Sequence, residues 1–192
     1  MATRYSWKGN GMKLLFLLEE ESCKECLNNI LPRILPPHIE FICVAHTGKS
    51  DLQRSIPIKL KGWNEPNAKF IIVHDQDNHN CIDLKNKLKD LCLVSQKEVL
   101  IRIVCTELES WYLGDLEALE QAYGGNICTD KNIHKFRNPD SIINSKEKLK
   151  EVTQNKYQPV SGSRQISTYM DIRKNKSSSF QIFVRGGLDF CK

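Results

Sequence analysis

The sequence predicts an α/β protein whose central, mostly parallel four-stranded sheet carries helices on both faces, followed by a C-terminal extension. Short apolar runs of strand length alternate four times with segments of helical periodicity, which is typical of a parallel sheet covered on both sides. A length of 192 residues and a hydrophobic content of 40% fit one domain with a full core. We therefore expect a core over residues 12–125, an extension over residues 126–192 packed on it, and a disordered leader or tag remnant over residues 1–11.

Four apolar runs predict the strands of this sheet. Each is short, rich in branched aliphatic residues and bounded by polar or turn-forming residues, as expected of strands buried on both faces. The predicted strands are Lys13–Leu18, Ile39–Ala45, Lys69–Val73 and Val99–Cys105.

A segment of helical periodicity follows each strand. The first helix is expected to begin near Ser22, where Ser22 and Glu25 match a capping box, and to stop before Pro36 and Pro37. Further helices are predicted over Leu52–Trp63, Cys81–Cys92, Thr106–Leu113 and Leu116–Tyr123.

The pattern weakens beyond Gly124. Residues 126–158 are polar, with one charged helix predicted over Ser145–Val152 that has little to anchor it. A helix is expected over Ile166–Ile172, and Ser177–Arg185 is compatible with either a short edge strand or a helix.

Composition narrows the classes of protein. No apolar run approaches the ~20 residues of a membrane-spanning helix, and Leu14–Leu18 is too short for the core of a signal peptide. We therefore expect a cytoplasmic protein without membrane contact. Cys23 and Cys26 form a C-x-x-C that lacks a second pair for zinc, which favours two thiols in a helical turn. The net charge of +5 permits contact with nucleic acid without requiring it.

The most informative local feature is an apolar strand, Phe70–Val73, that ends at Asp75 and Asp77. Ligands of open α/β sheets bind beyond the carboxyl ends of the strands, and carboxylate oxygens are the ligands that Mg²⁺ and Mn²⁺ prefer. The alternative is a turn that uses Asp and Asn as turn formers.

Two further acidic pairs follow predicted strands, and together they favour the metal interpretation. Because parallel strands end at one edge of a sheet, the acidic pairs can lie close together. Their like charges then repel one another unless a cation neutralises them. For Glu20, Glu21 and Glu109, a role as first-turn residues favoured by the helix dipole is an equal alternative. The pairs are Glu19 and Glu20, Asp75 and Asp77, and Glu107 and Glu109.

Several polar residues are candidates for binding a phosphate. Lys49, in the turn after the second strand, can face the same edge, although the upstream glycine of a phosphate-binding P-loop is missing. Ser161, Ser163 and Arg164 can bind a phosphate at a helix start, or act as simple helix caps. The lysines of residues 146–156 and 174–176 can follow a nucleic-acid backbone or form a solvated face.

Six segments resemble a known bacterial family, catalogued as domain of unknown function 4276, a Toprim-like group. The resemblance covers residues 13–187 and is most specific in the block ELESWYLGD. It implies a Toprim-like, Rossmann-like fold. The segments are FLLEEESCKECLNNILPRILP, HTGKSDLQRSIPIKLKGW, FIIVHDQD, CTELESWYLGDLEALEQAYG, YQPVSGSRQIS and SFQIFVRG.

The same resemblance implies roles for individual residues. Toprim domains, including those of OLD-type nucleases, place a glutamate after the first strand and a D-x-D after the third, which correspond to Glu19, Asp75 and Asp77. A later glutamate corresponds to Glu107, and a basic residue to Lys156 or Arg164. Members of the family are often encoded beside an ATPase in phage-defence loci, which implies such a partner.

The sequence thus predicts a Mg²⁺- or Mn²⁺-dependent nuclease that cuts DNA or RNA as the effector of an antiviral defence system. Assembly with further copies of the chain is left open. The alternative is a non-catalytic regulatory or sensor subunit that binds a partner ATPase, because Cys23 stands where OLD-like sites often have a second acid. A small-molecule phosphotransferase or phosphatase is a third option.

Overall fold

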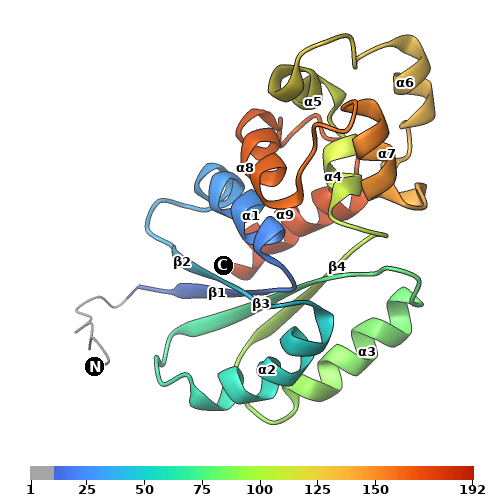
Figure 1. Ribbon diagram of the computed structural model, residues 1–192. Coiled ribbons are helices and arrows are strands. Elements are labelled where there is room, and N and C mark those ends of the chain that lie inside the picture. Colours follow the sequence, from blue (N-terminus) through green and yellow to red (C-terminus); the bar gives the residue numbers. More distant parts are fainter. Residues whose placement is uncertain (1–10) are drawn as a thin grey trace.

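A computed structural model describes residues 11–192 as a four-stranded parallel sheet with helices on both faces (Figure 1). The strand order is β2-β1-β3-β4. The largely apolar strand β1 and most of β3 are buried, whereas β2 and β4, at the two edges of the sheet, are only partly buried. The strands are β1 (Lys13–Leu18), β2 (Glu40–Ala45), β3 (Ala68–Asp75) and β4 (Val99–Val104).

Two helices cover one face of the sheet. Alternate residues of the strands, such as Leu15 and Phe70, pack against α2 (Lys49–Gly62) and α3 (Cys81–Cys92). Figure 1 shows both helices below the sheet. A side-chain cap from Asn80 to the N–H groups of Ile82 and Asp83 fixes the start of α3.

The opposite face carries the larger core. Figure 1 shows most of the C-terminal helices on this side, together with α1. Trp111 is fully buried here. Its ring centroid lies 5.2 Å from that of Phe180 in an edge-to-face arrangement and 5.1 Å from that of Phe183, whose ring is tilted. The helices on this side of the sheet are α1 (Glu21–Ile34), α4 (Glu109–Leu113), α5 (Leu116–Tyr123), α6 (Asp130–Lys135), α7 (Ser145–Val152), α8 (Pro159–Tyr169) and α9 (Ser178–Phe190), with a 3₁₀ helix over Pro139–Ser141.

The chain after residue 125 supplies much of this second layer. Helix α8 packs along α1, α7 packs on α4, and α9 lies against β4. Asn29 of α1 donates hydrogen bonds to the carbonyl of Arg164 and the hydroxyl of Ser167, which fixes α8 on α1. The proposed division between a core and an extension stays a prediction, and its leader, residues 1–11, lies almost entirely outside the described residues.

The predicted fold class is confirmed, and two local expectations need correction. The capping box at Ser22 is absent, because α1 begins after Glu20 and Glu25 is paired with Arg164. Helix α7 is anchored, because Leu149 is fully buried. Of the two alternatives for Ser177–Arg185, the helix is confirmed, since α9 begins at Ser178 and buries Phe180 and Phe183 at helical spacing.

The helices within residues 11–192 are all too short or too polar to cross a membrane.

Helix α8 packs closely against two tyrosine side chains at Gly162. A Cβ at this position would lie 2.5 Å from Cδ2 of Tyr157 and 2.7 Å from the hydroxyl of Tyr123. We therefore expect Gly162→Ala to lower the free energy of unfolding by about 1–3 kcal/mol, the usual cost of overpacking. Urea denaturation followed by circular dichroism measures this change.

Gly62→Ala is the matched control, because Gly62 is also helical and a Cβ there meets no atom within 4 Å. It should leave stability unchanged or raise it by up to about 1 kcal/mol. Equal effects of the two substitutions would contradict the close packing of Tyr157 on α8.

Candidate functional site

The carboxyl ends of β1, β3 and β4 bring the predicted acidic segments to one edge of the sheet. Because β1 ends opposite Val73 of β3, Glu19 follows β1 beside His74. Strand β3 continues to Asp75, which pairs with the last residue of β4. The acids that follow these three strands therefore start from neighbouring points, as the sequence predicts.

Asp75 lies at the centre of this edge. Its backbone N–H donates to Oε2 of Glu19 at 3.3 Å, and its Oδ2 accepts a hydrogen bond from the backbone N–H of Leu108 at 3.2 Å. Nδ1 of His74 lies 3.2 Å from the same Glu19 oxygen. These contacts connect the ends of β1 and β3 to the loop that precedes α4.

Asp77 turns away from the strand and meets α2. Its backbone is left-handed, with φ 49°, and its N–H donates to the carbonyl of Thr106 at 2.8 Å. Its Oδ2 accepts a hydrogen bond from Nζ of Lys49 at 3.0 Å. Lys49, a predicted substrate-binding residue, therefore lies at the acidic edge.

Glu107 and Glu109 diverge toward different partners. Glu107 accepts a hydrogen bond at 2.9 Å from the backbone N–H of Lys146, which has no partner within its own helix at the start of α7. Glu109 is buried and accepts one from the hydroxyl of Tyr157 at 2.9 Å. The charge of Glu109 still acts on Asp75.

Burial and mutual repulsion raise the pKa of three of these acids, Glu19, Asp75 and Glu109. Burial raises the pKa of Glu19 to about 7, an effect that the N–H of Asp75 opposes and the charge of Asp77 strengthens. Burial, followed by the charges of Glu19 and Glu109, raises the pKa of Asp75 well above its usual range. The pKa of Glu109 is also raised by burial, although its bond from Tyr157 opposes this. A cation at this edge would favour the charged form of each acid.

No three His, Cys, Asp or Glu side chains among residues 11–192 are already grouped as ligands of a metal ion. Each of the five predicted ligands instead accepts a hydrogen bond from one of the donors described above. A metal role for the acids of this edge stays a prediction. The acids it concerns are Glu19, Asp75, Asp77, Glu107 and Glu109.

The basic residues predicted from the C-terminal part have other partners. Nε of Arg164 donates to Oε2 of Glu25 on α1 at 2.6 Å, and Nζ of Lys156 donates to the carbonyl of Tyr123 at 3.4 Å. The charge of Lys146, by contrast, acts on the acids, since it opposes the rise in the pKa of Glu109.

The residues predicted to bind a phosphate at a helix start lie inside a helix. Ser161, Ser163 and Arg164 all lie within α8, which begins at Pro159. Ser161 is exposed, whereas Ser163 is fully buried beneath the surface of the helix. The two serines therefore do not share a face toward solvent.

Three further residues complete the surroundings of the acids, namely His74, Lys146 and Tyr157. The sequence pointed to Lys146 only as a contact for a nucleic-acid backbone, and it did not point to His74 or Tyr157. His74 interrupts the apolar alternation of β3 just before the acids, a signal that could have been used. Lys146 and Tyr157 come from the polar segment after residue 125, and local sequence carries no signal of their contacts.

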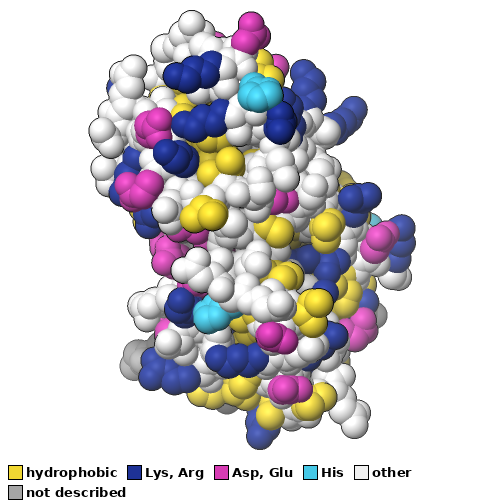
Figure 2. Space-filling model, turned by 90° about the vertical axis from the view of Figure 1, so that its right-hand side faces the viewer, with side chains coloured by type: hydrophobic (Ala, Val, Ile, Leu, Met, Phe, Trp, Pro, Cys, Tyr) yellow, Lys and Arg dark blue, Asp and Glu magenta, His cyan; other side chains and the backbone are white. Residues whose placement is uncertain are grey.

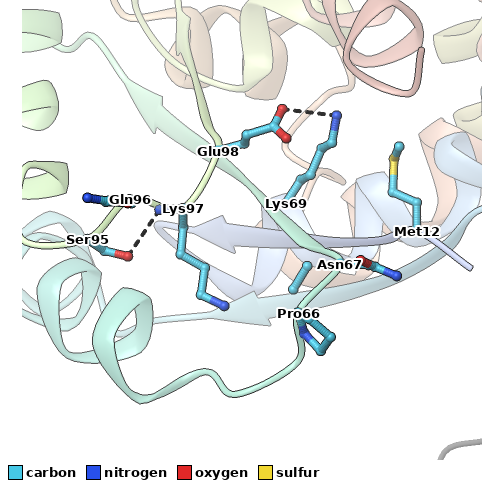
Figure 3. Close-up of a pocket in the computed structure, with 9 residues that line it drawn as sticks. Met12, Pro66, Asn67, Lys69, Ser95, Gln96, Lys97 and Glu98 are labelled. Carbon is cyan, nitrogen blue, oxygen red and sulfur yellow. Dashed lines mark hydrogen bonds and ion pairs between the residues drawn. The ribbon is translucent and has the colours of Figure 1, made fainter. Parts of the chain in front are cut away.

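A pocket of about 610 Å³ lies at the opposite edge of the sheet, near the start of β3 and β4 (Figure 3). Its charged side chains are paired, since Lys69 lies 3.0 Å from Glu98 and Lys97 donates to the carbonyl of Glu65. Because it lies at the opposite edge of the sheet, the pocket is separate from the acids that follow β1, β3 and β4.

Fold and site together define an α/β protein with buried carboxyls at the carboxyl edge of a parallel sheet. The sequence model of the family described as domain of unknown function 4276 matches residues 18–186. The chain belongs to this family. No curated protein and no solved structure matches it.

The raised pKa of Glu19 makes stability depend on pH. The folded state binds this proton with a pKa of about 7, against 4.5 for an ordinary glutamate. The contribution of Glu19 to stability is therefore fully present below pH 4.5 and is lost as the pH rises through about 7. We expect Glu19→Gln to raise the free energy of unfolding by about 3 kcal/mol at pH 8, but by less than about 1 kcal/mol at pH 5. Denaturant titrations of metal-free protein at both pH values measure this change in the free energy of unfolding.

Glu117→Gln is the control, because Glu117 is an exposed glutamate on α5. It should change stability by less than about 0.5 kcal/mol at either pH. A Glu19→Gln protein less stable than the wild type at pH 8 would show that Glu19 is charged and paired in the folded state.

Proposed function

We propose that the acidic edge is the active site of a Mg²⁺- or Mn²⁺-dependent nuclease that hydrolyses phosphodiester bonds in DNA or RNA. The observation that carries the proposal is the burial of Asp75 beside Glu19, with Asp77 two residues on. Buried like charges need either protons or a cation, and hard divalent cations prefer carboxylate oxygens.

The donor set fits such a cation. Glu19 and Asp75 would hold it, since their carboxyl groups are close enough for the charge of Glu19 to raise the pKa of Asp75. Asp77 could join them on release from Lys49. A bound divalent cation lowers the pKa of water and neutralises charge on a phosphate.

The chain's own cations would bind and orient the substrate. Lys49 is half exposed at the edge, with 49% of its side chain accessible, so its ammonium can contact a phosphate oxygen. Lys146 sits at the start of α7 beside Glu107 and Glu109. Together they supply positive charge on both sides of the acids, which favours a phosphate-bearing substrate.

A basic surface next to α7 supports a polyanionic substrate. Figure 2 shows Lys and Arg side chains gathered over the helices at the top of the molecule. A hollow of about 370 Å³ in this region is lined by His134, Lys135 and Arg137, with Asn138 and Ser141. Such cations can contact a nucleic-acid backbone without reading its sequence.

The family resemblance supports a cytoplasmic role in antiviral defence with a partner ATPase.

One observation favours the alternative of a non-catalytic regulatory subunit. Cys23 is buried close to Asp75 and Glu19, and burial raises the pKa of its thiol well above the ordinary value. A neutral thiol there supplies no second acid, so the edge has fewer ligands for a second metal ion.

We expect purified protein to cleave plasmid DNA, single-stranded DNA or tRNA in the presence of Mn²⁺ or Mg²⁺. Asp75→Asn should lower the cleavage rate by about 100-fold or more, because it removes a charged ligand while its amide oxygen can still accept from Leu108. Gel-based cleavage assays measure the rate.

Asp90→Asn, at an exposed aspartate of α3, is the matched control and should cleave like the wild type. Cleavage that persists in Asp75→Asn would overturn the proposed site. Wild-type protein that gives no binding heat with millimolar Mn²⁺ would favour the regulatory subunit.

A further inference from the structure

His74 is the one imidazole among residues 11–192 that is fully buried. It is placed on β3 immediately before Asp75, on the face of the sheet that α2 covers. Both ring nitrogens have polar neighbours. Nε2 lies 3.0 Å from the amide nitrogen of Gln53, and Nδ1 lies 2.7 Å from the carbonyl of Asp75 and 3.2 Å from Oε2 of Glu19.

These contacts determine where the proton of the ring lies. The amide nitrogen of Gln53 is a donor, so Nε2 of His74 accepts its hydrogen bond. The remaining proton is therefore on Nδ1, which donates to the carbonyl of Asp75 and lies 3.2 Å from Oε2 of Glu19. The ring thus connects α2 to the end of β3 by hydrogen bonds, and its Nδ1–H stands against the acid that follows β1.

Helix α2 reaches the acidic edge by two routes. Lys49 and Gln53 are four residues apart and so lie on the same face of the helix. Lys49 contacts Asp77 directly, whereas Gln53 reaches Glu19 through His74. The first turns of α2 therefore hold acids from two different strands.

We infer that His74 is a positioning residue of the acidic site, which holds the Glu19 carboxyl beside Asp75 through a Nδ1–H donor that Gln53 keeps in place. The inference rests on the proposed function, because it assigns His74 to the metal-binding form of that site. His74 itself touches neither substrate nor metal. Residues that orient ligands in this way commonly change metal affinity by about 10- to 100-fold.

The geometry distinguishes this role from simple core packing. An apolar side chain would fill the space between β3 and α2 equally well, as Ile72 does one alternation earlier on the same face. A side chain that only packs needs no donor at Nδ1. Asparagine, whose amide nitrogen can stand near Nδ1, should therefore restore what leucine loses.

Calorimetric titration with Mn²⁺ tests this difference. We expect His74→Leu to weaken Mn²⁺ binding by about 10- to 100-fold, and His74→Asn to recover most of that loss. In a Glu19→Gln background, His74→Leu should weaken binding no further, because its acceptor carboxyl is gone. Ile72→Val is the matched control on the same face and should bind Mn²⁺ like the wild type.

The ¹⁵N chemical shifts of the His74 ring give a readout without metal. The wild-type protein should show a single neutral tautomer with the proton on Nδ1. Gln53→Leu, which leaves β3 intact, should disturb that tautomer and weaken Mn²⁺ binding, and it serves as the test if His74→Leu does not fold.

Two results would overturn the inference: a wild-type ring with its proton on Nε2, or equal Mn²⁺ affinity in His74→Leu and the wild type. A wild-type protein that binds no Mn²⁺ overturns the proposed function instead. In that case the tautomer alone decides whether His74 positions Glu19.

Discussion

The burial of the Asp75 carboxyl at the end of β3, between Glu19 and Glu109, is the constraint on which the rest of this edge depends. A buried charge without partners is too costly for a folded protein, so such a group stays protonated, gains donors or binds a cation. The chain surrounds it with donors. The N–H of Leu108 reaches Asp75 itself, and the hydroxyl of Tyr157 reaches Glu109. These contacts connect the end of β3 to the start of α4, and α4 to the segment between α7 and α8.

The segment after residue 125 is part of this arrangement. Tyr157, between α7 and α8, is held by packing against Gly162 and supplies the donor to Glu109. The first turn of α7 supplies the N–H of Lys146 to Glu107. Because these contacts cross from one part of the chain to the other, the site needs both. The family match over residues 18–186 spans both parts.

Much of the fold was predictable from sequence because its strands are continuous apolar runs. The same logic placed Glu19, Asp75 and Lys49 at one edge, since parallel strands end together. Contacts between distant segments were not predictable. Glu25 is paired with Arg164 across 139 positions of sequence, so the local capping box does not form and the predicted basic residue is engaged elsewhere. Ser177–Arg185 was ambiguous because its helical face becomes evident only against Trp111, the residue that Phe180 and Phe183 contact.

The buried acids link the proposed activity to protons and to Lys49. A cation bound here would compete with the protons that the raised pKa values of Glu19 and Asp75 favour, so its affinity would rise with pH. If Asp77 joins the metal, it gives up the ammonium of Lys49. The ammonium of Lys49 would then lose its closest carboxylate, and a phosphate oxygen of the substrate could take the place of Asp77. In the proposed function, the ion pair between Lys49 and Asp77 is therefore the resting form of a substrate-binding group, and metal binding prepares the site for a phosphate.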